Sequence, residues 1–447
     1  MGAELIALSR VRGMFPVTDD YLLPESAASY AEDVDLESGS IRPVHRDTAY
    51  QGHVLNVDDG LDAGDAAPML FSVPVNRAGD IVILSRQFDH CAALSDISGD
   101  TRIYLAGPGV LSKLVRRKAS GDAVTITNAN PNGTDVPPAP DVTITRAEPD
   151  TAATRYAVAA ATYVYPDGSE GPLSPYCDEF AYSPGDAFAF APVPLPPSQP
   201  APIGVNFYIT VPSESSDVPN IKLIAETTSP QYPVSGTLPN DILGEAYPEF
   251  DPLPARIRTV AAAPWGGLAF TTEDEPGIVQ FTDTLYLNRV YRENDINVAA
   301  RVTCLLRGAN VLFVLCDDGG PFVISGTGLG NHIMTASHKT EILVSGPRGA
   351  SVADNTCVYA APHGLVAVGP EASVKAMSEG VVFDWRQWQE MGPRECALVF
   401  LSDDSIVFSM PAVQKTGVIK PYGLVWRSGG SRRAFAKLHS DNSIIFI

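Results

Sequence analysis

The 447-residue sequence has no apolar run approaching the roughly 20 residues that a membrane-spanning helix needs. Its first residues, MGAELIALSRVRGMFP, are too short and too polar for a secretory signal peptide. No stretch therefore predicts a membrane span or an export signal, and we expect a soluble chain.

Cysteine is scarce, with six residues in the chain, and none of them forms a CxxC pair. The six are Cys91, Cys177, Cys304, Cys316, Cys357 and Cys396. Most of them lie in apolar, strand-like runs, where a free thiol packs as a small hydrophobic group. We expect buried free thiols and a reducing compartment, rather than a disulfide framework or a thiolate metal site.

Basic residues are also few, with 31 Lys and Arg against 52 Asp and Glu, which gives a net charge of −21. Proteins that read DNA sequences carry basic patches, so this balance argues against that class. An acidic surface repels phosphates and would let DNA pass without adhering. An ordinary soluble acidic protein would have the same charge, so charge alone does not choose between the two.

Turn-forming residues are abundant, since 37 glycines and 38 prolines make up about 17% of the chain against an average of about 12%. Frequent turns between β-branched and aromatic runs predict an all-β fold. One pattern, an apolar strand, a Gly, Asn or Asp turn and a second apolar strand, recurs about every 45 residues, the length of one propeller blade. It occurs at Trp265–Phe270, Gly308–Cys316, Asn355–Val368 and Leu398–Met410. The prediction is a β-propeller-like repeat fold.

One segment interrupts the repeats. Its run YVYPDGSEGPLSP joins a β-rich stretch to a Pro-Asp-Gly turn, and further strands follow over roughly the length of one β-sandwich. Because Cys…Trp…Cys spacing is missing, a fibronectin type III-like β-sandwich is favoured over an antibody-type domain. The predicted units are an N-terminal adaptor segment at 1–50, first propeller blades at 51–138, the inserted sandwich at 139–250, and the remaining blades with a C-terminal closing strand at 251–447.

Two short helices are predicted within this β framework. The first would cover Glu25–Glu32, with Pro24 at its first position, where the missing N–H costs nothing. The second is FDWRQWQEMGP, which Asp384 would cap and Gly392 would end. Its two tryptophans, Trp385 and Trp388, are three residues apart and indicate a core-facing stripe, with a sugar-binding platform as the alternative.

Two groups of residues resemble metal ligands. Asp58, Asp59, Asp62 and Asp65 share one loop that could bind Ca²⁺, but their spacing misses the EF-hand pattern, so a solvated loop is favoured. His332, His338 and His363 lack acidic residues at a matching spacing, which makes a zinc site weak.

Two further patterns resemble parts of active sites. GTGLGN (Gly326–Asn331) looks like a phosphate-binding loop, yet a β-like run follows it instead of the helix that such a loop needs, so a blade turn is favoured. Glu379, Asp384 and Glu390 could form a carboxylate pair, but helix capping and solvent exposure account for them. We therefore predict no catalytic, cofactor-binding or metal-ligating residue, and a protein that is not an enzyme.

Several motifs together resemble those of one known family. They are PFVISGT (Pro321–Thr327), APHGLVAV (Ala361–Val368), EGVVFDWRQW (Glu379–Trp388), the N-terminal YLLPESAASYAEDVDLESGSIRPV and the YVYPDGSEGPLSP insert. These resemble the tail nozzle (tubular tail or tail hub) proteins of short-tailed double-stranded DNA bacteriophages. The likeness touches both ends and the middle of the chain. One departure is Cys316–Gly319, where the family usually has Thr-X-Gly; the turn is kept and charge is added.

The resemblance implies a propeller with peripheral insertions that assembles as a ring, usually a homohexamer, below the head-to-tail adaptor and portal. Such a ring is the exit channel for the genome and holds tail fibres or a tail tip or needle. Double-stranded DNA would pass without sequence-specific binding, through a lumen kept acidic because Lys and Arg contacts to phosphates would slow it. The implied location is the virion tail, assembled in the host cytoplasm.

Two other functions remain open. The inserted sandwich could make this a tail-associated adhesion protein that contacts a receptor or a fibre. A propeller enzyme that degrades glycans would need two carboxylates roughly 5–10 Å apart, and these could come from different blades. Such an enzyme would usually carry more surface aromatic residues than the four tryptophans present here.

Overall fold

The computed structural model describes most of residues 54–427 and short strands on either side of that range. The flanking strands are 13–14, 27–28, 34–35, 42–43, 435–437 and 444–446. Within 54–427 it leaves out 58–68, 76–78, 96–100, 118–123, 130–134, 149–152, 154, 167, 198–200, 212–219, 240, 248–249, 328–331, 337–343, 378–384, 402–404 and 421–422.

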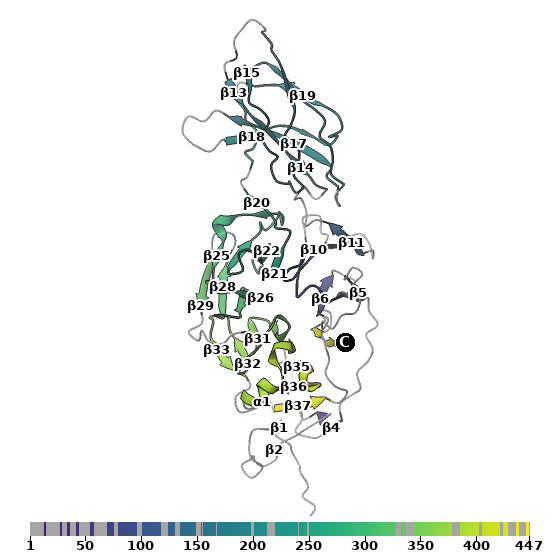
Figure 1. Cartoon of the computed structure of the whole chain (residues 1–447), viewed down its shortest axis with the longest axis vertical. Helices are drawn as coiled ribbons and strands as arrows, with labels where there is room; N and C mark the ends of the chain where they lie inside the picture. The colour runs from purple at the N-terminus through teal and green to yellow at the C-terminus, as the bar shows by residue number, and fades with distance from the viewer. Residues whose placement is uncertain are drawn as a thin grey trace, which may run out of the picture.

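Among the described residues, six sheets stand in a ring (Figure 1). Blade 1 has the strand order β5–β7–β6, with β5 (Val54–Asn56) parallel to β7 (Gly79–Ser85) and β6 (Met69–Val75) antiparallel to it. The other five are four-stranded antiparallel meanders whose strands follow one another in sequence, except that β24 (Arg289–Val290) comes between the third and fourth strands of blade 3 and pairs outside it. This arrangement is the predicted all-β, propeller-like fold.

The five meanders have the following strands. Blade 2 has β8 (His90–Ser95), β9 (Thr101–Ala106), β10 (Lys113–Arg117) and β11 (Val124–Ala129). Blade 3 has β21 (Ile257–Ala262), β22 (Leu268–Thr272), β23 (Ile278–Phe281) and β25 (Ile296–Asn297). Blade 4 has β26 (Val302–Arg307), β27 (Val311–Cys316), β28 (Phe322–Gly326) and β29 (His332–Ala336). Blade 5 has β30 (Ala350–Ala353), β31 (Thr356–Ala361), β32 (Gly364–Val368) and β33 (Val374–Ala376), and blade 6 has β34 (Ala397–Phe400), β35 (Ile406–Met410), β36 (Lys415–Lys420) and β37 (Gly423–Arg427).

The repeat length read from the sequence is confirmed. The first strands of blades 3 to 6 begin at residues 257, 302, 350 and 397, which are 45 to 48 residues apart. Asp354, in the turn between β30 and β31, has φ 52, the left-handed conformation that a two-residue hairpin turn requires.

Apolar side chains from successive blades pack into separate clusters, because each blade buries both faces of its central strands. One cluster joins blades 1 and 2 and includes Val73 and Ile103, and the next joins blades 2 and 3 and includes Tyr104 and Phe270. Three more clusters continue this pairing from blade 3 to blade 6. Four of the six cysteines, at 304, 316, 357 and 396, are buried in these clusters as free thiols, as predicted.

The C-terminal hairpin lies at the remaining gap, between blades 6 and 1. Its strands β38 (Phe435–Lys437) and β39 (Ile444–Phe446) pair with each other. β38 lies beside both β34 of blade 6 and β6 of blade 1. The last strands of the chain therefore contact the first blade of the ring.

A β-sandwich projects beyond blades 2 and 3 at one end of the molecule (Figure 1). One sheet has the order β12 (Val142–Thr145), β16 (Ala187–Phe190), β19 (Val234–Thr237), and the other β14 (Ala159–Val164), β17 (Gly204–Val211), β18 (Asn220–Thr227). A short pair, β13 (Arg155–Ala157) and β15 (Phe180–Tyr182), completes it. The pairings β12–β16 and β14–β17–β18 match the B–E and C–F–G pairings of immunoglobulin-like sandwiches. Phe190 and Phe207 stack between the two sheets with ring centroids 4.3 Å apart.

The N-terminal strands lie at the opposite end of the molecule, where β1 (Gly13–Met14) contacts β37 of blade 6 (Figure 1). The predicted helix Glu25–Glu32 is wrong, because β2 (Ala27–Ala28) lies there and pairs with β1. An isolated helix shorter than about 12 residues is marginal, so pairing with a neighbouring strand overrides the local preference. After β2, the strand β3 (Val34–Asp35) pairs antiparallel with β4 (Arg42–Pro43).

The second predicted helix is confirmed as α1 (Trp385–Glu390). It ends at Gly392, whose φ of 74 is the left-handed conformation typical of a helix C-terminus, and Pro393 follows. Trp388 is buried in the cluster between blades 5 and 6, as a core-facing residue should be. In the part of the chain that the structure describes, no helix has the length and apolarity to cross a membrane.

Candidate functional site

A cavity of about 430 Å³ lies on the axis of the ring. Its described lining comes from six strands, β6, β8, β21, β26, β30 and β34, one from each blade. Each of these strands is at the edge of its sheet. One edge strand per blade around a common cavity is the arrangement of a six-bladed propeller, so the described residues settle the blade number that the sequence left open.

Small side chains line much of this cavity where the six strands converge. They include Ala92, Ala93, Ala261, Ala262 and Ala397. β8, with the sequence HCAALS, was not predicted as a strand, because alanine is depleted in strands and gives a weak local signal. The remaining lining mixes Leu, Val and Phe with polar residues that include Asp89, His90, Arg307 and Arg348.

An ion pair crosses the axis between opposite blades. Arg348 Nη2 lies 3.6 Å from Asp89 Oδ1, and each side chain is about a quarter exposed. Asp89 immediately precedes β8 of blade 2, whereas Arg348 lies in the turn η3 (Pro347–Gly349) that leads into β30 of blade 5. Burial raises the pKa of Asp89, and the Arg348 guanidinium offsets part of that rise. The pair therefore connects blades that are three positions apart in the ring.

Two more titratable side chains, His90 and Cys304, line the same cavity. His90 is 7% exposed, and burial, helped by the nearby charge of Arg258, lowers its pKa to about 4, so its imidazole is neutral at pH 7. Burial raises the pKa of the Cys304 thiol well above its ordinary value, and its Sγ donates to the Pro347 carbonyl at 3.5 Å. Because the thiolate is the nucleophilic form, Cys304 is chemically inert here.

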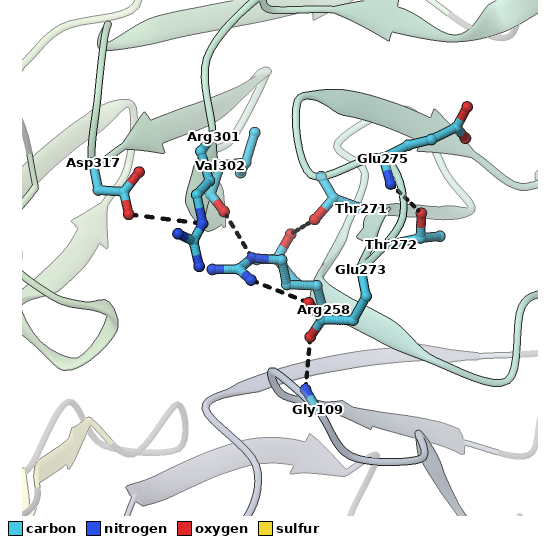
Figure 2. Close-up of polar contacts among 10 residues, drawn as sticks. Gly109, Arg258, Thr271, Thr272, Glu273, Glu275, Arg301, Val302 and Asp317 are labelled. Atoms are coloured by element: carbon cyan, nitrogen blue, oxygen red, sulfur yellow. Dashed lines mark hydrogen bonds and ion pairs between the residues drawn. The ribbon is translucent and has the colours of Figure 1, made fainter.

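Figure 2 shows a polar network that joins three blades beside this cavity. Arg258 Nε on β21 donates to the Val302 carbonyl of blade 4 at 3.4 Å, and its Nη1 contacts Glu273 Oε2 at 3.2 Å. Glu273 Oε1 also accepts from the backbone N–H of Gly109 in blade 2 at 2.6 Å. The pair of a buried Arg258 and a partly exposed Glu273 thus connects blades 2, 3 and 4 through charge-assisted hydrogen bonds.

Many of the sequence-predicted candidates lie outside the described residues. These are Asp58, Asp59, Asp62, Asp65, His338, Glu379 and Asp384, together with the side chains of His332 and Trp385. Of the others, His363 is exposed in the turn between β31 and β32, and Glu390 is exposed on α1. Within the described part of the chain, no three His, Cys, Asp or Glu side chains gather as metal ligands.

Residues 328–331 of the GTGLGN pattern lie outside the described part of the chain. Gly326 ends β28 and His332 begins β29, so a strand rather than a helix follows the loop. This bears out the blade-turn interpretation, since a phosphate-binding loop needs helical amides behind it.

The cavity offers limited chemistry. Among its described lining residues, Asp89 is the single carboxylate, and it is paired with Arg348. A glycan hydrolase needs two carboxylates that flank the scissile bond, which this described lining does not supply. Sequence reasoning missed Asp89, His90 and Arg348 because their place around one cavity depends on ring closure, and the strand signal of the HCAALS run beside Asp89 is weak.

Comparisons with known proteins show no relative. No protein-family model matches the sequence, and no curated protein matches it. Among solved structures, a streptogramin B lyase is 10% identical, over 86% of this chain and 96% of that one, with a TM-score of 0.31. BBS1N in complex with ARL6DN is 11% identical, over 86% and 93% of the two chains, with a TM-score of 0.31.

A third similar structure, Myxococcus xanthus glutaminyl cyclase, is 10% identical over 42% of this chain and 84% of that one, with a TM-score of 0.25. None of the three is a phage tail protein. TM-scores of this size carry no argument about the present chain. Its fold assignment therefore rests on its own strand pairing and on the lining of the axial cavity.

Proposed function

We propose that this protein is a structural subunit of a phage tail nozzle, without catalytic activity. The observation that carries the proposal is where the family-like motifs lie. Trp388 of EGVVFDWRQW donates from Nε1 to the Ala361 carbonyl of APHGLVAV at 2.7 Å, and Gln389, just after the motif, contacts the Pro362 carbonyl. These motifs join α1 to the turn between β31 and β32, the two central strands of blade 5, which is a structural role away from the axial cavity.

The axial cavity of one subunit is not the proposed path of the genome. A cavity of about 430 Å³ has the size of a small-molecule site. It is too small for a double helix whose major groove alone is about 12 Å wide. The Asp89–Arg348 pair also crosses it. In this proposal, the DNA channel is the larger opening that several copies enclose when they assemble as a ring.

The shape of the subunit supports assembly with several partners. The sandwich and the N-terminal strands lie at opposite ends of the propeller (Figure 1). Each subunit therefore offers separate surfaces for neighbouring copies, for the adaptor and portal, and for tail fibres or a tail tip. The net charge of −21 suits a lumen that repels phosphates and lets DNA slide.

Electron microscopy of the purified chain, alone and with its neighbouring tail proteins, tests the proposal. We expect a ring, commonly of six copies, with an open axial hole between subunits and Asp and Glu side chains facing that hole. A stable monomer that never joins a tail would contradict the proposal. A lumen lined with Lys and Arg would contradict the charge argument.

A further inference from the structure

We propose that Glu170 is an orientation latch, a residue that fixes the sandwich at one angle on blade 3 through buried contacts with Asn288 and Arg289. Glu170 belongs to the YVYPDGSEGPLSP stretch, which no part of the ring explains. The proposal concerns the joint between the sandwich and the propeller within one chain. It stands whether or not the protein is a nozzle subunit.

The carboxylate of Glu170 is held first by the sandwich itself. Its Oε1 accepts from the Tyr208 hydroxyl at 2.6 Å and from Asn206 Nδ2 at 3.0 Å, and the Thr162 hydroxyl also contacts it. These three partners lie on β14 and β17 of one sheet. Glu170 is therefore part of the sandwich, positioned with its second carboxylate oxygen free for another partner.

That second oxygen faces the propeller. Glu170 Oε2 lies 3.6 Å from Arg289 Nη2, and both side chains are 11% exposed. The neighbouring Asn288 donates from Nδ2 to the backbone carbonyl of Glu170 at 2.7 Å. Asn288 and Arg289 are consecutive residues at β24 (Arg289–Val290), so one short segment of the propeller contacts both the side chain and the backbone of Glu170.

Aromatic rings fix the position of Arg289. Its guanidinium lies over the rings of Tyr286 and Phe250, at 4.2 and 4.9 Å from their centroids. A planar, always charged guanidinium suits this combination of aromatic stacking and carboxylate pairing. Tyr286 holds Arg289 from the propeller side, and Phe250, the last residue of the inserted segment, covers it from the sandwich side, so the contact requires one relative orientation of the two parts.

The same rings continue into the sandwich. Tyr247 lies 5.3 Å from Phe250 and 5.3 Å from Tyr208 between ring centroids, and its hydroxyl donates to the Gly171 carbonyl at 3.4 Å. The Tyr208 hydroxyl also donates a hydrogen bond to the Glu170 carboxylate. The Glu170–Arg289 ion pair and the row of aromatic rings therefore meet at the same place, where the segment around Glu170 faces the segment around Arg289.

The chain returns to the propeller at the same place. β20 (Asp251–Pro252) pairs with β24, and Arg292 Nε contacts Asp251 Oδ2 at 2.9 Å. This connection and the chain that enters the sandwich after β11 of blade 2 together form a tether, which leaves the angle of the sandwich free to vary. Relative motion is the default for two domains that share a small polar interface. The contacts of Glu170 remove that freedom.

A distance measurement between the two parts tests the latch. Spin labels on genetically encoded ketone side chains would replace exposed Tyr232 on the sandwich and exposed Glu371 on blade 5, so that no cysteine is used. We expect a narrow distance distribution in the full chain. Arg289→Gln should widen it at least twofold. Arg301→Gln removes an equal charge from an exposed pair with Asp317 in blade 4 and should leave the width unchanged.

A second label pair, at Tyr156 and Tyr232 within the sandwich, shows whether the sandwich stays folded. If Arg289→Gln widens the first distribution and not the second, the latch is supported. An unchanged first distribution would overturn the proposal. If both widen, Asn288→Ala, which removes a single hydrogen bond to the Glu170 carbonyl, decides: a wider distribution between the parts supports the latch, and an unchanged one overturns it.

Discussion

The ring and the joint hold their parts together in different ways. In the ring, apolar clusters repeat between successive blades, with buried residues such as Phe270, Phe313 and Trp388. In the joint, one carboxylate, one guanidinium and a few aromatic rings define how the sandwich sits. The comparison teaches that stability here is spread over many similar contacts, whereas orientation depends on a few specific ones.

The physical reason is the directionality of the contacts. Apolar burial is nearly non-directional and scales with area, so each blade boundary contributes in the same way. A buried ion pair is favourable only at one geometry, and removing one partner leaves an uncompensated charge. A polar joint therefore selects an angle even where it adds little to the free energy of unfolding.

The largest expected effects come from truncating one buried aromatic side chain in each region. Phe313→Ala, in the cluster between blades 4 and 5, and Phe207→Ala, in the sandwich core, should each cost about 3–5 kcal/mol. Because the blades pack on one another, Phe313→Ala should lower the melting temperature of the whole propeller. Phe207→Ala should lower only a separate sandwich transition. Scanning calorimetry measures both.

The control for this pair is Tyr156→Ala, at a side chain that is 63% exposed on the sandwich. It should change the stability by less than about 0.5 kcal/mol. If Phe313→Ala and Phe207→Ala shifted one common transition equally, the ring and the sandwich would unfold as one unit, and the contrast between them would fail.

A smaller effect is expected at His90 in the ring. Its pKa is lowered to about 4 by burial, and by the charge of Arg258, from an ordinary 6.5. Between these two values the unfolded chain binds the proton more tightly, so stability is fully present above pH 6.5 and falls as the pH drops toward 4. His90→Asn should remove about 1–3 kcal/mol of this acid-induced loss.

Urea unfolding of wild type and His90→Asn at pH 7.5 and at pH 4.5 measures the difference. The quantity to compare is the change in unfolding free energy between the two pH values for each protein, which cancels any packing cost of the substitution. Equal changes in both proteins would show that His90 does not control the acid sensitivity of the ring.

The smallest effect, with the opposite sign, is expected at Asp295 beside the joint. Burial raises its pKa to about 6; Arg292 lowers it, and Glu275 and Asp251 raise it further. The folded chain binds this proton more tightly, so stability rises as the pH falls from about 6 toward 4. Asp295→Asn should stabilise the protein at pH 7 by about 1–2 kcal/mol and lose that advantage near pH 4.

The same urea experiment tests this prediction at pH 7 and pH 4. Asp317→Asn, at a side chain that is 42% exposed in blade 4, is the matched control and should change stability by less than about 0.5 kcal/mol. A gain from Asp295→Asn that is equal at both pH values would mean that packing, not titration, causes it.

Local patterns predicted much of the fold. The repeat of about 45 residues, the helix Trp385–Glu390 and the buried Trp388 all follow from spacing, capping and turn residues, which act over short stretches. The helix predicted at Glu25–Glu32 failed because a parallel partner, Gly13–Met14, was available. The strand His90–Ser95 was missed because its alanines carry a weak strand preference.

The sequence by itself determined the all-β character, the repeat length and the presence of one inserted unit, because these depend on residues that are neighbours along the chain. Only the tertiary structure decided that six blades surround the axis, that Asp89 meets Arg348 across it, and that Glu170 meets Arg289 at the joint. The partners of each pair are more than 100 residues apart. Such contacts arise from how repeated units close into a ring and dock an insert, which no local pattern specifies.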